Sequence, residues 1–252
     1  MNGKKLLFLI VLSIFFTSCQ KPTGNIGFLF SFSVDKTALV QDSICYINSA
    51  GNRYEITEAQ YFISKIVLTK EDGTTYSILS DDGIHYVDAD IPETLNWRPD
   101  DEIPAGTYKS ISFVFGIEDD ENISYRFPNY PENNMSWPGN IGGGYHYMKI
   151  NGRWINDRDS LALFNLHMGR GQQRDADGNI TGFIDNSFTI TLPIHLLMQK
   201  NEASVLNLNM DINNWFQSPN VYDLNTFGSG IMQNQQAQET LIENGRDVFS
   251  VL

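Results

Sequence analysis

Apolar and polar residues alternate with a period of two in four separate segments, and this pattern limits the fold more than any other feature of the chain. The segments are residues 28–34, 110–115, 187–192 and 206–212. In the first, Phe28, Phe30 and Phe32 alternate with Leu29 and Ser31. Successive side chains of a strand point to opposite faces of a sheet, so each segment has one apolar face to cover. Four such faces predict an all-β fold, a two-sheet antiparallel β-sandwich.

The segments between the strands agree with this fold. Asp72-Gly73 lies between two strand-like runs and predicts a hairpin turn, and residues 103–106 predict the turn that enters a strand at Thr107. Residues 175–179 resemble the start of a calcium loop, but the glycine comes too early and no helix flanks it, which favours another hairpin. Residues 237–244 predict a short C-terminal helix that ends near Gly245.

The segment 118–144 has no sustained alternation and carries prolines, asparagines and a glycine cluster. It also contains several large apolar side chains, namely Tyr125, Phe127, Tyr130, Met135 and Trp137. Leaving so many apolar groups in water is costly, so we expect one long ordered loop over one end of the sandwich.

The N-terminus predicts export. Two lysines precede an apolar run at residues 6–16, and small residues lead to Cys19. This order is typical of a secretory signal, and a cysteine at the cleavage point resembles the bacterial lipobox. We therefore expect a signal peptide at 1–18, a lipidated tether at 19–25 and one domain at 26–252, held as an outer-membrane lipoprotein facing the periplasm or the cell surface. The alternative is an ordinary signal peptide with an incidental cysteine.

Composition excludes some classes of protein. The formal net charge is −13, whereas nucleic-acid binding requires a basic surface. Beyond Cys19 the chain has one further cysteine, Cys45, so an internal disulfide framework is excluded. Cys45 lies in an apolar run, which favours a buried thiol over a metal ligand.

No catalytic motif is present: the chain has no Gly-x-Ser-x-Gly elbow, no phosphate loop and no His-Glu-x-x-His pair, so we expect no enzyme activity. The four histidines are His85, His146, His167 and His195. Taken singly, each is more often structural than a ligand. Two of them have a methionine within two positions, and copper favours imidazole with a soft or weak ligand nearby.

The order of several short motifs resembles the copper-binding MbnP-like family, in its Bacteroidetes lipoprotein branch. The motifs are the Phe-rich first strand, residues 61–68, 85–88, 103–108 with 113–117, 135–137 with 144–149, 164–169 and 247–251. Together they cover most of the chain after the tether.

The resemblance implies a β-sandwich that holds one copper ion through histidines and a tryptophan oxidised to kynurenine by a dihaem peroxidase-like partner. Carried over by position, Trp137 is the modified residue, His85 and His167 are ligands, and His146 is a further candidate. This sequence departs from the family at two places. Thr69-Lys70 stands where methanotroph members have a second histidine, and Pro138-Gly139 stands where a second tryptophan is usual.

The rival interpretation is a metal-free accessory lipoprotein that binds a glycan or a protein partner through the loop 118–144. Aromatic rings stack well on sugar rings. The rings that could form such a platform are Tyr125, Tyr130, Trp137, Tyr145 and Trp154.

Overall fold

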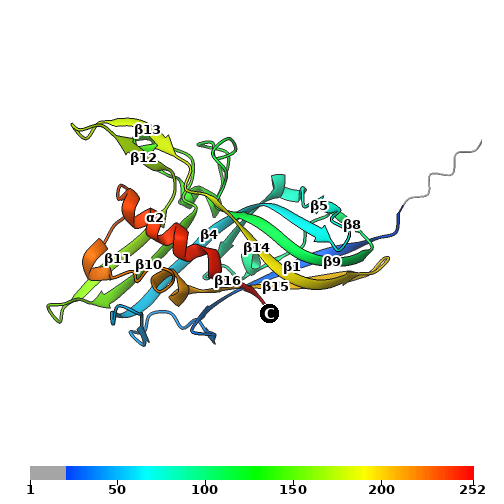
Figure 1. Ribbon diagram of the computed structural model, residues 1–252, viewed down its shortest axis with the longest axis horizontal. Coiled ribbons are helices and arrows are strands. Elements are labelled where there is room, and N and C mark those ends of the chain that lie inside the picture. Colours follow the sequence, from blue (N-terminus) through cyan, green and yellow to red (C-terminus); the bar gives the residue numbers. More distant parts are fainter. Residues whose placement is uncertain (1–20) are drawn as a thin grey trace, which may run out of the picture.

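The computed structural model describes residues 21–252, and the expected signal peptide and Cys19 lie outside this range. Two β-sheets pack against each other, with helices and loops at their ends (Figure 1). The predicted all-β sandwich, with its long ordered loop and short C-terminal helix, is confirmed. Within residues 21–252 no helix is long and apolar enough to cross a membrane.

The larger sheet has the strand order β11-β10-β4-β9-β14. These strands are β11 (Leu161–Met168), β10 (Met148–Ile155), β4 (Arg53–Lys70), β9 (Gly106–Phe115) and β14 (Phe188–Met198). Three short strands also pair with β4: β3 (Tyr46–Ile47), β5 (Thr75–Ser77) and β6 (Ile84–Asp88). The turn between β4 and β5 contains Gly73 at a φ of 89°, as the Asp72-Gly73 motif predicts.

The second sheet has the order β16-β15-β1-β2. Its strands are β16 (Phe249–Val251), β15 (Ala203–Asp211), β1 (Thr23–Val34) and β2 (Thr37–Ala38), and β7 (Asn96–Trp97) and β8 (Glu102–Pro104) also pair with β1. β1 and β15 run parallel, so the expectation of a wholly antiparallel sandwich is wrong at this pair. The alternation of side chains fixes which face of a strand is buried, but not its direction. β1 also begins at Thr23, inside the segment expected to be a tether.

The core lies between the sheets and contains the predicted apolar faces. Phe28, Phe30 and Phe32 are at most 8% exposed, while Leu29 between them is 41% exposed. Burying one such phenylalanine contributes about 1.5–3 kcal/mol, so these faces are a principal source of stability.

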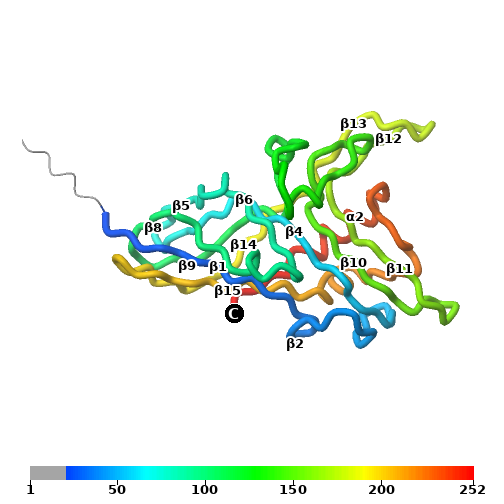
Figure 2. The backbone as a smooth tube through the Cα atoms, turned by 180° about the vertical axis from the view of Figure 1, so that it is seen from behind, coloured from blue at the N-terminus to red at the C-terminus, as the bar shows by residue number. Residues whose placement is uncertain are grey.

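A separate two-stranded hairpin, β12 (Gly171–Arg174) and β13 (Ile180–Ile184), stands out from the body in both views (Figures 1 and 2). Its tip is a turn in which the Asp175 carboxylate accepts the backbone N–H groups of Asp177 and Asn179. The hairpin predicted for residues 175–179 is therefore confirmed.

The helices are short. They are α1 (Leu224–Phe227), α2 (Gln235–Asn244) and the 3-10 helices Ser80–Gly83, Pro92–Leu95, Glu132–Met135, Gly139–Ile141, Ile212–Phe216 and Gly245–Asp247. Asn234 caps α2 by accepting the backbone N–H of Ala237, and Leu241 is buried against the body as expected.

Cys45 is exposed, so the prediction of a buried thiol is wrong. The apolar run around it forms only the two-residue strand β3, and Ile47 within it is 59% exposed. An apolar run predicts burial only where a second layer covers it.

Candidate metal centre

The centre lies at one end of the β10–β11 hairpin, where Met148 pairs with Met168 and Lys149 with His167. Alternation along β11 buries Phe164, Leu166 and Met168 and places His167 on the opposite, polar face. The His167 Nε2 lies 2.8 Å from the Asn151 Oδ1 on the neighbouring strand.

His146 immediately precedes β10, and its orientation is fixed by one backbone carbonyl. Its backbone N–H and its ring Nδ1 both approach the Met135 oxygen, at 2.6 and 2.9 Å. A carbonyl oxygen can only accept, so Nδ1 carries the proton and Nε2 keeps a lone pair. That Nε2 is buried and has no hydrogen-bond partner among the described residues. A buried polar atom without a partner is costly and points to a ligand or another function.

Three of the predicted site residues come together here. The rings of His146 and His167 are perpendicular, with centroids 5.0 Å apart, and the Trp137 ring packs edge-on to His146 at 4.7 Å. Trp137 is 3% exposed and donates its indole N–H to the Ile141 oxygen.

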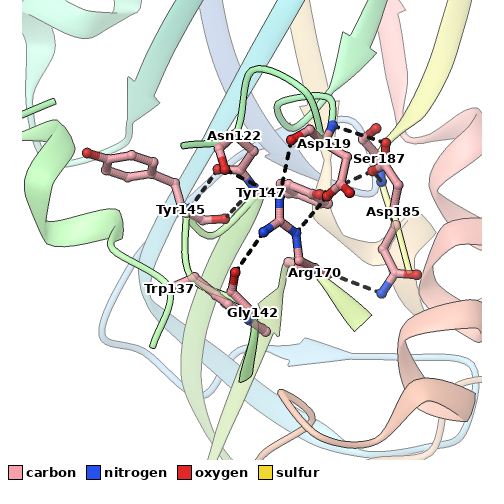
Figure 3. Close-up of polar contacts among 12 residues, drawn as sticks. Asp119, Asn122, Trp137, Gly142, Tyr145, Tyr147, Arg170, Asp185 and Ser187 are labelled. Carbon is pink, nitrogen blue, oxygen red and sulfur yellow. Dashed lines mark hydrogen bonds and ion pairs between the residues drawn. The ribbon is translucent and has the colours of Figure 1, made fainter. Parts of the chain in front are cut away.

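Arg170 fastens the long loop that carries Trp137 (Figure 3). Its guanidinium donates to the Asp119 carboxylate and to the backbone oxygens of Asp119, Asn122 and Gly142. The Asn122 side chain in turn accepts the backbone N–H of Tyr145 and donates to its carbonyl. Both ends of the segment that contains Trp137 are thus fastened to the sandwich.

Both imidazoles of the centre are neutral at neutral pH. Burial, reinforced by the neighbouring His167, lowers the pKa of His146 to about 3. Burial, reinforced by the charge of Lys149, lowers the pKa of His167 to about 4. Each ring therefore offers one unprotonated nitrogen, which is the form that binds a metal ion.

His85 stands apart from the other three residues. Its ring is stacked between Phe30, at 5.0 Å, and Trp97, at 4.6 Å, both from the second sheet. Its Nε2 donates to the Thr94 oxygen, and burial lowers its pKa to about 4. His195 is exposed on β14.

The donors fit a metal ion that accepts few ligands. Within residues 21–252 no three His, Cys, Asp or Glu side chains are close enough to one another to hold a metal ion. The pair His146–His167 offers two neutral nitrogens, and imidazole suits copper.

Sequence reasoning missed the Met135 carbonyl and Asn151, which orient the two imidazoles, and Arg170, which fastens the loop that carries Trp137. Arg170 directly follows the motif 164–169, and Asn151 lies two residues after the motif 144–149. No local signal marks either, because their partners lie on other strands and in the long loop.

These features define a two-layer β-sandwich protein with paired neutral histidines beside a buried tryptophan. The chain belongs to the MbnP family, whose sequence profile matches residues 23–233. The resemblance expected from the motifs is thus confirmed, and the family is linked to copper handling.

A solved structure similar to this chain is MbnP from Methylosinus trichosporium, with a TM-score of 0.54 and 14% identity. The likeness covers 79% of this chain and 80% of that chain. At this identity it shows a shared fold. No curated protein matches the chain.

Proposed function

We propose that this protein is a non-catalytic copper-binding protein that holds one ion between His146 and His167, next to Trp137. The observation that carries the proposal is the buried Nε2 of His146, which has no partner among the described residues and whose ring contacts a second neutral imidazole. Family membership supports copper as the metal.

The character of the donors favours monovalent copper. Divalent copper prefers a tetragonal set of nitrogen and oxygen ligands, including charged ones. The centre instead offers two neutral nitrogens in a largely buried position, where a second positive charge is costly.

The experiment measures copper by elemental analysis and monovalent-copper affinity by competition with a coloured chelator. We expect about one copper per wild-type chain, lost in His146→Gln and in His167→Gln. His195→Gln is the matched control because His195 is an exposed histidine on β14. His85→Gln tests the site that the family resemblance implied. Retention of full copper binding by both His146→Gln and His167→Gln would overturn the assignment.

We also propose that Cys19 carries lipid and anchors the domain in the cell envelope as an outer-membrane lipoprotein. The support is the signal-like N-terminus. A dihaem peroxidase-like partner that oxidises Trp137 belongs to the same proposal. Intact-mass measurement on protein from the native host tests both, since lipid and kynurenine each change the mass.

A second candidate function is glycan binding, and one specific observation favours it. Tyr125 and Tyr130 are 92% and 67% exposed. Their chain neighbours Arg126 and Pro131 line a cleft of about 750 Å³, and Asp82 lines it as well. Clefts of this size hold small ligands.

Fewer aromatic rings are available to bind a glycan than the sequence predicts. Trp137, Tyr145 and Trp154 are at most 5% exposed and cannot stack on a sugar. Titration with neutral oligosaccharides tests this candidate, since binding must weaken in Tyr125→Ala and Tyr130→Ala and stay unchanged in His146→Gln.

A further inference from the structure

The Asn151 amide lies between the His167 ring and the Glu58 carboxylate. On β10, Asn151 is paired directly with Glu58 of β4 and diagonally adjacent to His167 of β11. Its Nδ2 donates to the Glu58 Oε2, and its Oδ1 faces the His167 Nε2 at 2.8 Å. All three side chains are half-buried and belong to the polar face of the larger sheet.

The Glu58 carboxylate sets the direction of both hydrogen bonds in the series Glu58–Asn151–His167. A carboxylate only accepts hydrogen bonds, so Asn151 must turn its NH₂ group toward Glu58 and its oxygen toward His167. An amide oxygen also only accepts, so the His167 Nε2 must carry the proton. A neutral imidazole has one ring proton, and the lone pair is therefore on Nδ1.

We propose that Glu58, acting through Asn151, is the positioning group that selects the tautomer of His167 and leaves Nδ1 free for a metal ion. The role of Nδ1 rests on the proposed function. The choice of tautomer is a property of the metal-free protein. Groups that orient metal-binding histidines through their second nitrogen commonly alter metal affinity 10–100-fold.

Other groups hold Glu58 in place. Gln60 donates to the Glu58 Oε1 at 2.7 Å, and the Lys149 ammonium lies 3.7 Å from the same oxygen. The Gln60 amide also donates to Asp88, which accepts the Tyr86 hydroxyl as well. A shift in register between β4 and β10, directly after Asn151, marks the place where Glu58 meets Asn151.

Two variants test whether Glu58 selects the tautomer of His167 or only links strands β4 and β10. In Glu58→Gln, residue 58 can present either an oxygen or an NH₂ group, so the Asn151 amide is free to turn over. The double variant Glu58→Gln/Asn151→Asp restores the polarity, because the new aspartate accepts from both the glutamine and the His167 Nε2. A purely structural tie predicts instead that the tautomer of His167 stays unchanged in Glu58→Gln.

The experiment records long-range nitrogen–proton NMR spectra of metal-free protein labelled with ¹⁵N in histidine, at neutral pH. We expect His167 with its proton on Nε2 in the wild type, a mixture of tautomers in Glu58→Gln, and the wild-type tautomer again in the double variant. His146 is the internal control, because a backbone carbonyl fixes its tautomer. A single Nε2-protonated form of His167 in Glu58→Gln would overturn the inference, as would a proton on Nδ1 in the wild type.

Copper affinity, measured on the same variants, distinguishes failure of this inference from failure of the proposed function. We expect affinity for monovalent copper to fall about tenfold in Glu58→Gln and to recover in the double variant. Loss of copper in His167→Gln with no change of tautomer in Glu58→Gln refutes the role of Glu58 and leaves the copper site standing. A tautomer change in Glu58→Gln, with full copper binding in both His146→Gln and His167→Gln, supports the role of Glu58 and refutes the site.

Discussion

Gly169 lies directly against the benzenoid ring of Trp137. A Cβ built on Gly169 would be 2.6 Å from the Trp137 Cε3 and 2.7 Å from its Cζ3. Because Trp137 is fastened through its N–H to Ile141 and packs on His146, the ring cannot yield without disturbing the centre. The absence of a side chain at position 169 is thus a requirement of the tryptophan's position.

We therefore expect Gly169→Ala to lower the free energy of unfolding by about 1–3 kcal/mol, as overpacking of a core usually does. Chemical denaturation followed by circular dichroism measures this change. Gly139→Ala, in the loop that carries Trp137, is the matched control, because nothing lies within 4 Å of a Cβ at that position. Equal stability of the two variants would show that Trp137 does not press on Gly169.

Much of the sandwich could be predicted because its signals are local. The alternation at Phe28, Phe30 and Phe32 predicts a buried face, and the turn at Gly73 follows from the positive φ that glycine tolerates. The parallel pairing of β1 with β15 could not be predicted in this way. Those strands are far apart along the chain, so no short connection fixes their relative direction.

The candidate centre was predictable only in its residue types. His85 and His167 both lie in strands, but His85 stacks on Phe30 of the opposite sheet, while His167 lies on the polar face beside Asn151. Which face a histidine takes depends on register, and a slip of one residue reverses it. His146 was the weakest candidate by position, and the Met135 carbonyl that orients it is supplied by the loop.

The exposed Cys45 makes a direct prediction about labelling. A thiol open to solvent reacts with a maleimide without unfolding, so a folded chain that begins at Lys21 should take up one label. Intact-mass measurement before and after denaturation checks this result, with Cys45→Ser as the unlabelled control. Labelling that requires denaturant would contradict the exposed position.

Removing the Arg170 side chain should loosen the long loop. Its guanidinium satisfies the Asp119 carboxylate and the carbonyls of Asn122 and Gly142, and hydrogen bonds to a charged group contribute about 1.5–3 kcal/mol each. Arg170→Gln should therefore raise the rate of chymotrypsin cleavage within residues 118–144 about tenfold or more. Arg158→Gln, at an exposed arginine, should leave the rate unchanged. Equal cleavage of the two variants would mean that other contacts hold the loop.

Three histidines, one of them buried and two half-buried, should make the metal-free protein less stable in mild acid. Burial lowers the pKa values of His85 and His167 to about 4 and that of His146 to about 3, from an ordinary value of 6.5. Below pH 6.5 the unfolded chain binds protons that the folded chain does not, so the free energy of unfolding falls as the pH drops toward 4. Urea midpoints across this range should decline, and less steeply in His146→Gln, which lacks one of the three groups. Midpoints that stay constant between these pH values would show that the imidazoles are protonated equally in both states, and that they are not buried in the way the structure places them.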